Sequence, residues 1–115
     1  MNEFYRRDIY TANIPMPSTF FSKFKVRPVL IIQNDDLNRK REDVIVVAIP
    51  STMKRSAESF NHVFTDHSSL GLKVKSVAIC SSILTIPKAL LKQRLGQVSV
   101  DEMASISEKN IRCIS

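Results

Sequence analysis

The fold is decided by residues 25–34, whose sequence is Lys-Val-Arg-Pro-Val-Leu-Ile-Ile-Gln-Asn. At its centre is a run of four large apolar residues, three of them β-branched, between Pro28 and the turn-forming sequence Asn34-Asp35-Asp36. Such a run is typical of a strand buried on both faces, although periodicity alone leaves a short buried helix open. Pro28 can begin this strand because its missing N–H falls outside the hydrogen-bonded ladder.

Arg27 directly precedes that proline, and a residue in this position is pushed out of the α region into an extended conformation. We therefore expect Arg27 to leave the start of a central strand in a restricted direction, on the same face as Val29 and Ile31. Its guanidinium is a planar fork of donors that fits a phosphate group better than a lysine ammonium does. Arg27 is a candidate phosphate ligand, and the alternative is a salt bridge to Asp8 or Asp35.

Length and composition indicate one globular domain that spans residues 1–115. The chain is long enough to bury a core without metal or disulfide support, and its charged and hydrophobic fractions, 24% and 43%, are ordinary. A formal net charge of +6 favours an anionic partner such as nucleic acid or an acidic peptide. The alternative is that the lysines only keep the protein soluble.

No segment of the sequence indicates a membrane or a cofactor. No apolar run approaches the roughly 20 residues of a membrane span, and residues 1–8 are too polar for a signal peptide. Cys80 and Cys113 lack metal-ligand spacing, so we expect two reduced thiols in a cytoplasmic protein, although one disulfide remains open. Neither a metal nor a cofactor is predicted.

The first half of the chain predicts a β core. Residues 8–14 alternate well enough for a first strand, with Ile9 or Tyr10 facing inward. Residues 44–49 form a second continuous apolar run, which predicts another fully buried strand. A polar connection over 35–43 would join the two buried strands into a hairpin.

The second half carries shorter signals. Residues 61–64 are compatible with a short strand and residues 76–84 with a longer one, bent at Ser81 and Ser82. A Thr-Ile-Pro sequence then predicts a short helix over 88–94, stopped by a following glycine.

The end of the chain predicts a helix that packs on the β core. Ser99 and Glu102 have the spacing of a capping box, in which each side chain satisfies the other residue's backbone N–H. The apolar positions expected along one stripe of this helix are Met103, Ile106, Ile111 and Ile114.

Residues 15–26 predict a long loop of unusual composition, and loops of this length are often functional or mobile. Two prolines open it, and aromatic residues then alternate with lysines: Phe20, Phe21, Lys23, Phe24 and Lys25. The aromatic rings could stack on unpaired bases while the lysines neutralise phosphates. Alternatively, Phe20 and Phe24 fold back as a lid on the β core or form a dimer surface.

The order of these signals resembles the MazF/PemK family of toxins from bacterial toxin–antitoxin pairs. The matching blocks span nearly the whole chain and are residues 6–10, 27–35, 44–49, 71–72, 76–78, 85–86, Lys88 and 95–99. This resemblance implies a mainly β (α+β) fold, a small SH3-like β-barrel with a C-terminal helix, which usually forms a homodimer. It also implies a metal-independent endoribonuclease that cuts single-stranded RNA and is neutralised by an antitoxin whose C-terminal segment occupies the RNA groove.

Several family positions differ in this sequence. Arg27 carries over from the family motif, whereas the catalytic Thr or Ser after the third strand falls on Pro50 or Ser51. Ser51 is the natural candidate, with Thr52 as its substitute. The arginine and aspartate that some members carry before the Thr-Ile pair correspond to Ile79 and Ser81.

Metal-independent RNA cleavage needs a group that accepts the 2′-hydroxyl proton, groups that stabilise the charge on phosphorus, and an acid for the departing 5′ oxygen. In this hypothesis Arg27 binds the phosphoryl oxygens, and Ser51 holds a second oxygen or orients the 2′-hydroxyl. His62 is a candidate acid–base group, with a half-buried structural histidine as the alternative. The predicted RNA-binding residues are Lys23, Phe24, Lys25, Lys54, Arg55, Ser81 and Ser82.

A different class of function is also compatible with the sequence. The gyrase-poisoning CcdB toxins share this barrel and act by binding alone, so the fold does not decide the chemistry. They depend on a tryptophan near the C-terminus, and this chain has no tryptophan. A non-catalytic member that binds RNA, its antitoxin or another target remains the alternative.

Overall fold

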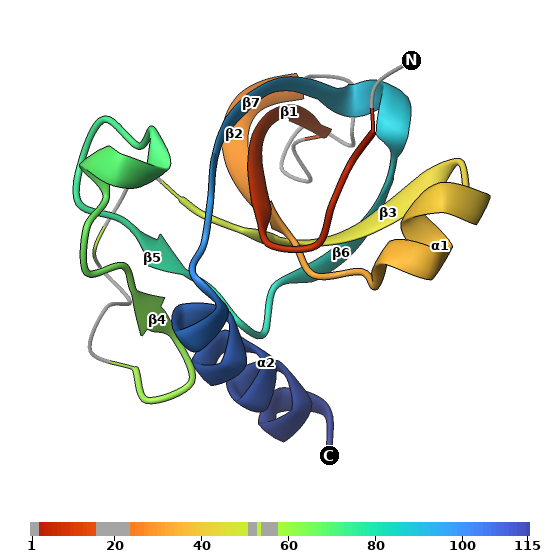
Figure 1. Cartoon of the computed structure of the whole chain (residues 1–115). Helices are drawn as coiled ribbons and strands as arrows, with labels where there is room; N and C mark the ends of the chain where they lie inside the picture. Colours follow the sequence, from red (N-terminus) through yellow and green to blue (C-terminus); the bar gives the residue numbers. More distant parts are fainter. Residues whose placement is uncertain (1–2, 16–23, 51–52, 54–57) are drawn as a thin grey trace.

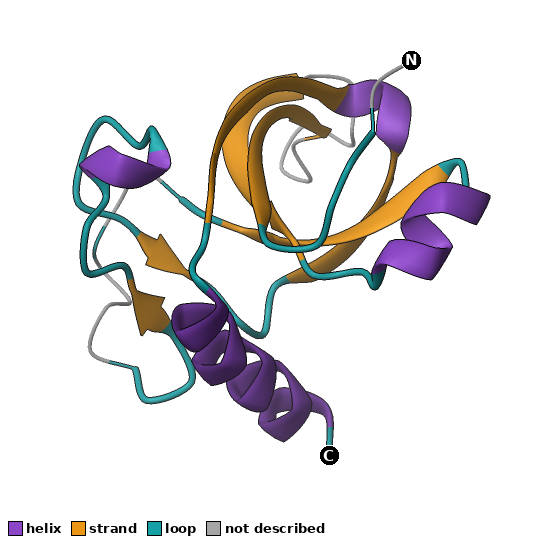
Figure 2. Cartoon of the chain, viewed as in Figure 1, coloured by secondary structure: helices purple, strands orange, loops and turns teal. Residues whose placement is uncertain are grey.

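A five-stranded antiparallel sheet and a two-stranded sheet carry the fold, with a long helix at the C-terminus (Figures 1 and 2). The computed structural model describes residues 3–15, 24–50, 53 and 58–115. The elements are β1 (Asp8–Pro15), β2 (Phe24–Ile31), α1 (Asp35–Lys40), β3 (Asp43–Ala48), β4 (His62–Val63), the 3-10 turn η2 (Ser68–Leu70), β5 (Val77–Ala78), β6 (Ile83–Pro87), the 3-10 turn η3 (Lys88–Leu90), β7 (Leu91–Gln97) and α2 (Val100–Ile114). The predicted mainly β fold with a C-terminal helix is confirmed. The large sheet curls, with the order β6-β3-β2-β1-β7, but it does not close, because β6 and β7 stay at its two edges.

β2 is the central strand, as predicted, and it has a buried half and an exposed half. Val29 and Leu30 are fully buried between β1 and β3, and the predicted hairpin with β3 is confirmed by the pairing of Leu30 with Val47. The strand begins four residues earlier than expected, since Phe24 pairs with the last residue of β1. The loop predicted over 15–26 is therefore wrong at its C-terminal end, where extension of the β1 pairing outweighs the polar composition.

The faces of β2 contribute to two separate cores, because successive side chains point to opposite sides of a strand. Leu30 packs with Ile9, Phe64 and Ile106 in a core that also receives α2. The second core, on the other face, contains Tyr10, Ala12, Val29, Ile31, Val44, Val46, Ile86 and Leu91. Both Ile9 and Tyr10 of the predicted first strand are thus buried.

The connection predicted over 35–43 contains the helix α1. The Asn34 side chain accepts a hydrogen bond from the Leu37 N–H at 2.9 Å, which caps the first turn. Acidic residues occupy that turn and basic residues the last one, as the helix dipole favours. The prediction of a polar link missed this helix because it has no apolar stripe.

Residues 88–94 do not form the predicted helix. Lys88–Leu90 make a single 3-10 turn, and β7 begins at Leu91 and pairs with β1. β2 pairs with only one edge of β1, and residues 91–97 pair with the other edge. This tertiary pairing outweighs the local helical signal. The strand predicted over 76–84 is likewise split into β5 and β6, with the expected bend closed by the Ser82 N–H donating to the Ile79 carbonyl at 2.9 Å.

The cap and the first half of the stripe predicted for α2 are confirmed. Ser99 Oγ accepts the Glu102 N–H at 3.1 Å, and Met103 and Ile106 are buried. Glu102, however, turns its carboxylate to β4 instead of completing the capping box. The predicted stripe is wrong at its end, where Ile111 and Ile114 are 61% and 75% exposed.

The buried face of α2 continues through a polar residue. Asn110 lies one turn after Ile106 and donates from Nδ2 to the Cys80 carbonyl at 2.8 Å. Because this amide satisfies a buried carbonyl, a polar residue occupies a position for which hydrophobic periodicity predicts an apolar one. Cys80 and Cys113 both carry free thiols.

Candidate active site

Arg27 lies where the buried half of β2 gives way to its exposed half. It pairs with Ala12 of β1 and is half-buried, on the strand face that also carries Val29 and Ile31. The neighbouring side chains of Phe24 and Val26 are more than half exposed. Arg27 therefore lies on the central strand, and the side chain of the residue before it, Val26, is already exposed to solvent.

The end of β3 is aligned with this position. The Ile49 N–H donates to the Pro28 carbonyl at 3.1 Å, which extends the antiparallel alignment of β2 and β3 beyond the last ladder pair. Pro50 comes next, and continuation of this antiparallel register sets it opposite Arg27. The predicted catalytic residues Ser51 and Thr52 follow Pro50 in the sequence and lie outside the described residues.

The predicted serine pair lies on the other side of β3. The Ile79 N–H donates to the Ala48 carbonyl at 3.0 Å, and the Ala48 N–H donates to the Ser82 carbonyl at 3.2 Å. Ser81 is exposed at the turn and Ser82 is half-buried. The structure thus places Arg27 and this serine turn on the two sides of the end of β3.

The remaining RNA-binding predictions divide between described and undescribed residues. Phe24 and Lys25 begin β2 with exposed side chains, and Lys25 pairs with Ile14. Lys23, Lys54 and Arg55 lie outside the described residues. Lys25 therefore extends the Arg27 face of β2, whereas Phe24 lies on the opposite face of the strand, with Val26 and Pro28.

A cavity of about 460 Å³ opens beside this end of β2. Val26 and Pro28 line one wall, and the segment from Gly71 to Val74 lines the other. Gly71 has a φ of +74°, and a Cβ there would lie 2.4 Å from the Leu95 carbonyl oxygen, so only glycine lets this segment approach β7 so closely. Lys73 contributes the only charged side chain among the described residues of this lining, which is mainly apolar. Sequence reasoning missed this cavity, and its one signal is an apolar Val74 between two lysines.

His62 is held elsewhere in the fold. Its Nε2 lies 2.7 Å from Glu102 Oε1, and its ring meets Phe64 edge-to-face at 5.4 Å between centroids. Figure 1 shows β4, which carries His62, beside the first turns of α2 and well away from β2. The structure places Phe24 and Lys25 on the same strand as Arg27 and the turn at Ser81 and Ser82 across the end of β3, but it does not bring His62 there.

The described residues offer no metal centre and no activated thiol. No group of three or more His, Cys, Asp or Glu side chains among them could hold a metal ion. Burial raises the pKa of the Cys80 thiol to about 11, which keeps it protonated near neutral pH. No helix in the described part of the chain is long and apolar enough to cross a membrane.

Comparison with known proteins identifies a matching family and a relative with similar sequence. A family model described as the PemK-like, MazF-like toxin of type II toxin–antitoxin systems matches residues 5–112. The Endoribonuclease MazF of Staphylococcus saprophyticus is 33% identical over 102 residues, which cover 89% of this chain and 83% of that protein.

Solved structures share the arrangement of sheets and helix. An endoribonuclease in complex with its cognate antitoxin, from a mycobacterial species, aligns with a TM-score of 0.78 at 20% identity, over 96% of this chain and 94% of that one. A MazE–MazF structure from Deinococcus radiodurans aligns with a TM-score of 0.76 at 15% identity, over 100% and 98% of the two chains. At these identities the alignments establish the fold.

Proposed function

The chain belongs to the PemK-like, MazF-like toxin family of type II toxin–antitoxin systems, and we propose that it is a metal-independent endoribonuclease that cleaves single-stranded RNA. The observation that carries the proposal is the position of Arg27, fixed on the central strand beside the end of β3, with exposed Lys25 on the same strand face. The 33% identity to an Endoribonuclease MazF supports the same reaction class.

The 2′-oxygen of one nucleotide attacks the adjacent phosphorus, and the bond from phosphorus to the 5′ oxygen of the next nucleotide breaks. The products are a 2′,3′-cyclic phosphate and a free 5′-hydroxyl, with one proton lost from the 2′-hydroxyl and one gained by the leaving oxygen. Arg27 binds the phosphoryl oxygens, on which negative charge grows in the transition state. Ser51, or Thr52 in its place, holds a second oxygen or orients the 2′-hydroxyl.

RNA is held along the surface around Arg27. Phe24 offers a ring for base stacking, and base–aromatic stacking contributes about 1–3 kcal/mol per base in single-strand binders. Lys25 neutralises a neighbouring phosphate, and the exposed Ser81 offers a hydroxyl across the end of β3. Lys23, Lys54, Arg55 and Ser82 complete the proposed contact set.

The proposed assembly is a cytoplasmic homodimer that a cognate antitoxin inhibits. The mycobacterial and Deinococcus relatives were solved as complexes with an antitoxin or with MazE, which supports an antitoxin partner for this chain. The antitoxin would cover the surface around Arg27 and so exclude RNA.

The test is RNA cleavage in the presence of EDTA. We expect cleavage of a single-stranded RNA to 2′,3′-cyclic phosphate ends and no cleavage of the 2′-deoxy analogue. Arg27→Ala should lower the rate about a hundredfold, which corresponds to about 3 kcal/mol of lost transition-state stabilisation.

Arg41→Ala is the matched control, because it removes the same charge from an exposed residue after α1, at the opposite end of β2. Equal rates for Arg27→Ala and the unmodified protein would contradict the mechanism. RNA binding without any cleavage would instead indicate the non-catalytic class of function.

A further inference from the structure

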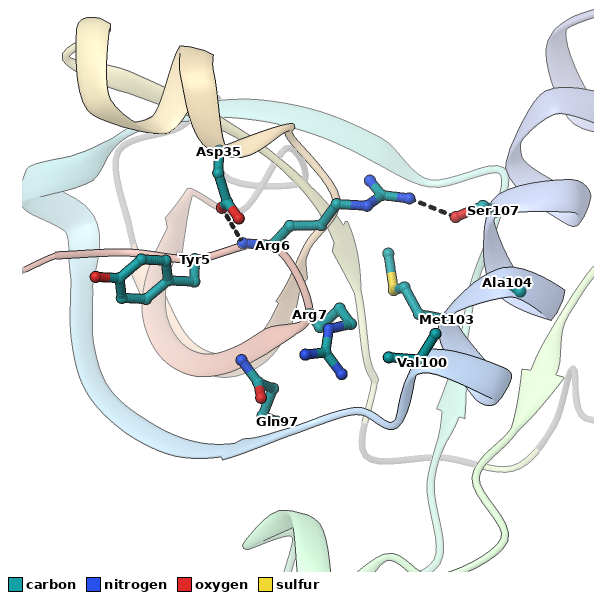
Figure 3. A pocket seen from close by; sticks show the side chains of 9 residues that line it. All are labelled: Tyr5, Arg6, Arg7, Asp35, Gln97, Val100, Met103, Ala104 and Ser107. Carbon is teal, nitrogen blue, oxygen red and sulfur yellow. Dashed lines mark hydrogen bonds between the residues drawn. The ribbon is translucent and has the colours of Figure 1, made fainter.

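A second cavity, of about 430 Å³, lies at the far end of β2 from Arg27 (Figure 3). It is open to solvent and is bounded chiefly by the segment that precedes β1 and by one face of α2, and the Arg7 N–H ties that segment to the Ile31 carbonyl at 2.9 Å. Its volume falls in the usual range for ligand sites. This cavity is separate from the proposed nuclease surface.

Two consecutive arginines enter this cavity from a fixed turn. Arg7 has a φ of +83°, a left-handed conformation that costs a non-glycine residue about 1–2 kcal/mol. Its carbonyl accepts the Val98 N–H at 2.9 Å, so both sides of this residue are held by backbone hydrogen bonds. Backbone strain that a fold retains tends to occur at functional sites, and here it directs the Arg7 side chain toward Gln97 and Val100 (Figure 3).

Neither guanidinium is neutralised within the described part of the chain. Arg7 donates from Nη1 to the Val98 carbonyl at 2.9 Å, and Arg6 donates to the Ile32 carbonyl and to Ser107 Oγ. All three acceptors are uncharged. Asp35 also lines the cavity, but its Oδ1 accepts the Arg6 backbone N–H at 2.7 Å and does not form an ion pair with either guanidinium among the described residues. Because a guanidinium has five donors, both forks can still bind an anion.

The opposite wall of the cavity, on α2, is apolar apart from Ser107. Val100, Met103 and Ala104 lie at helical spacing on one face of α2, and Val100 is 66% exposed. An exposed valine beside two unneutralised arginines fits a ligand that presents a carboxylate next to an apolar group. A peptide with an acidic residue beside an aliphatic one has this chemistry.

Nearby charge favours a peptide over a nucleic acid. Besides Asp35 in the lining, Asp101 follows Val100 on α2 with an exposed side chain. An RNA strand carries a charge at every nucleotide and would be repelled there, whereas a peptide can place a single carboxylate. We propose that this cavity binds an acidic peptide segment, with its carboxylate between Arg6 and Arg7 and its apolar neighbour against Val100 and Met103.

The experiment uses two synthetic tetrapeptides and the full chain. N-acetyl-Leu-Glu-Ala-Leu-amide is titrated while the backbone amide resonances of the protein are followed, and N-acetyl-Leu-Gln-Ala-Leu-amide is the uncharged control. We expect saturable shifts at residues 6, 7, 97 and 100, with binding about tenfold tighter for the acidic peptide. Equal binding of the two peptides would overturn the proposal, and so would shifts elsewhere only.

A matched pair of variants places the site. Val100→Glu puts a carboxylate into the cavity, at a helix N-terminus that tolerates it, and should weaken the acidic peptide about tenfold. Ile111→Glu makes the same change on an exposed position of α2 outside the cavity lining and should leave binding unchanged. Equal losses from both variants would overturn the assignment.

A third titration tests the competing class of ligand. A 2′-deoxy oligonucleotide should leave the four cavity resonances unmoved, and stronger shifts there than the peptide produces would assign the cavity to nucleic acid and overturn the proposal. RNA cleavage by Val100→Glu should match the unmodified protein. The peptide result therefore stands or falls independently of the nuclease proposal.

Discussion

At the scale of single residues, Arg7 makes one stabilising and one destabilising contribution to the folded state. Its side chain donates a hydrogen bond to the Val98 carbonyl, while its φ of +83° opposes folding. Arg7→Ala removes the hydrogen bond and keeps the unfavourable φ. Arg7→Gly removes both, because glycine adopts positive φ without a Cβ clash.

We therefore expect Arg7→Gly to be more stable than Arg7→Ala by about 1 kcal/mol, the reverse of the order found at ordinary positions. Urea denaturation of the two variants measures this difference. An alanine variant equal to or more stable than the glycine variant would show that this φ carries no cost.

Cys80 makes stability depend on alkaline pH. Burial raises the pKa of its thiol from 9.0 to about 11, so between these values the folded state keeps a proton that the unfolded state loses. The free energy of unfolding should then fall as the pH rises above 9, by about 3 kcal/mol at most near pH 11. Burial also raises the pKa of Tyr10, which acts in the same direction.

The measurement is a series of urea denaturations between pH 8 and pH 11. Cys80→Ala should flatten the decline with pH, whatever its effect on stability at pH 8, and the part due to Tyr10 should remain. An unchanged decline in the variant would contradict the assignment to Cys80.

At the scale of secondary-structure elements, the start of α2 depends on one hydroxyl. Ser99→Ala removes the cap of the Glu102 N–H and should lower the free energy of unfolding by about 1 kcal/mol. Ser59 is an exposed serine outside the helices, so Ser59→Ala serves as the control and should change stability by less than about 0.5 kcal/mol. Thermal unfolding of both variants tests this expectation.

The elements that the sequence predicts correctly are those whose signal is local. β2 and β3 are continuous apolar runs, and the Ser99 cap lies next to its helix. The prediction of a helix in place of β7 is wrong because the partner strand β1 is about 80 residues away in the chain. No local pattern shows which edge of a sheet is available for pairing. The prediction for Ile111 and Ile114 failed because a buried carbonyl recruits Asn110 into the packed face of α2.

The candidate site divides in the same way. The place of Arg27 on the central strand could be predicted because Pro28 and the apolar run lie directly beside it, and its role in catalysis stays a prediction. The cavity at Arg6 and Arg7 could not be predicted, since it requires a positive φ and a helix nearly a hundred residues away. The one signal of this cavity in the sequence is the pair of arginines that precedes the first strand.

At the scale of the whole molecule, the net charge of +6 should make RNA binding depend on salt. For single strands the logarithm of the binding constant falls by about 0.7 per phosphate contact for each unit of log salt concentration. Arg27→Ala should therefore reduce this slope by about 0.7, and Arg41→Ala should leave it unchanged. Fluorescence anisotropy with a labelled 2′-deoxy oligonucleotide measures both slopes, and equal slopes for the two variants would remove Arg27 from the phosphate contacts.

β2 carries its buried half and its exposed half on one backbone. Changes at the buried residues disturb both cores, whereas surface substitutions usually alter stability by less than about 0.5 kcal/mol. Over evolutionary time, descendants of such a gene can diversify residues 24–26 and so acquire new sequence preferences, while the scaffold beneath is inherited intact. Selection can therefore act on recognition through the exposed half of β2 and on folding through its buried half.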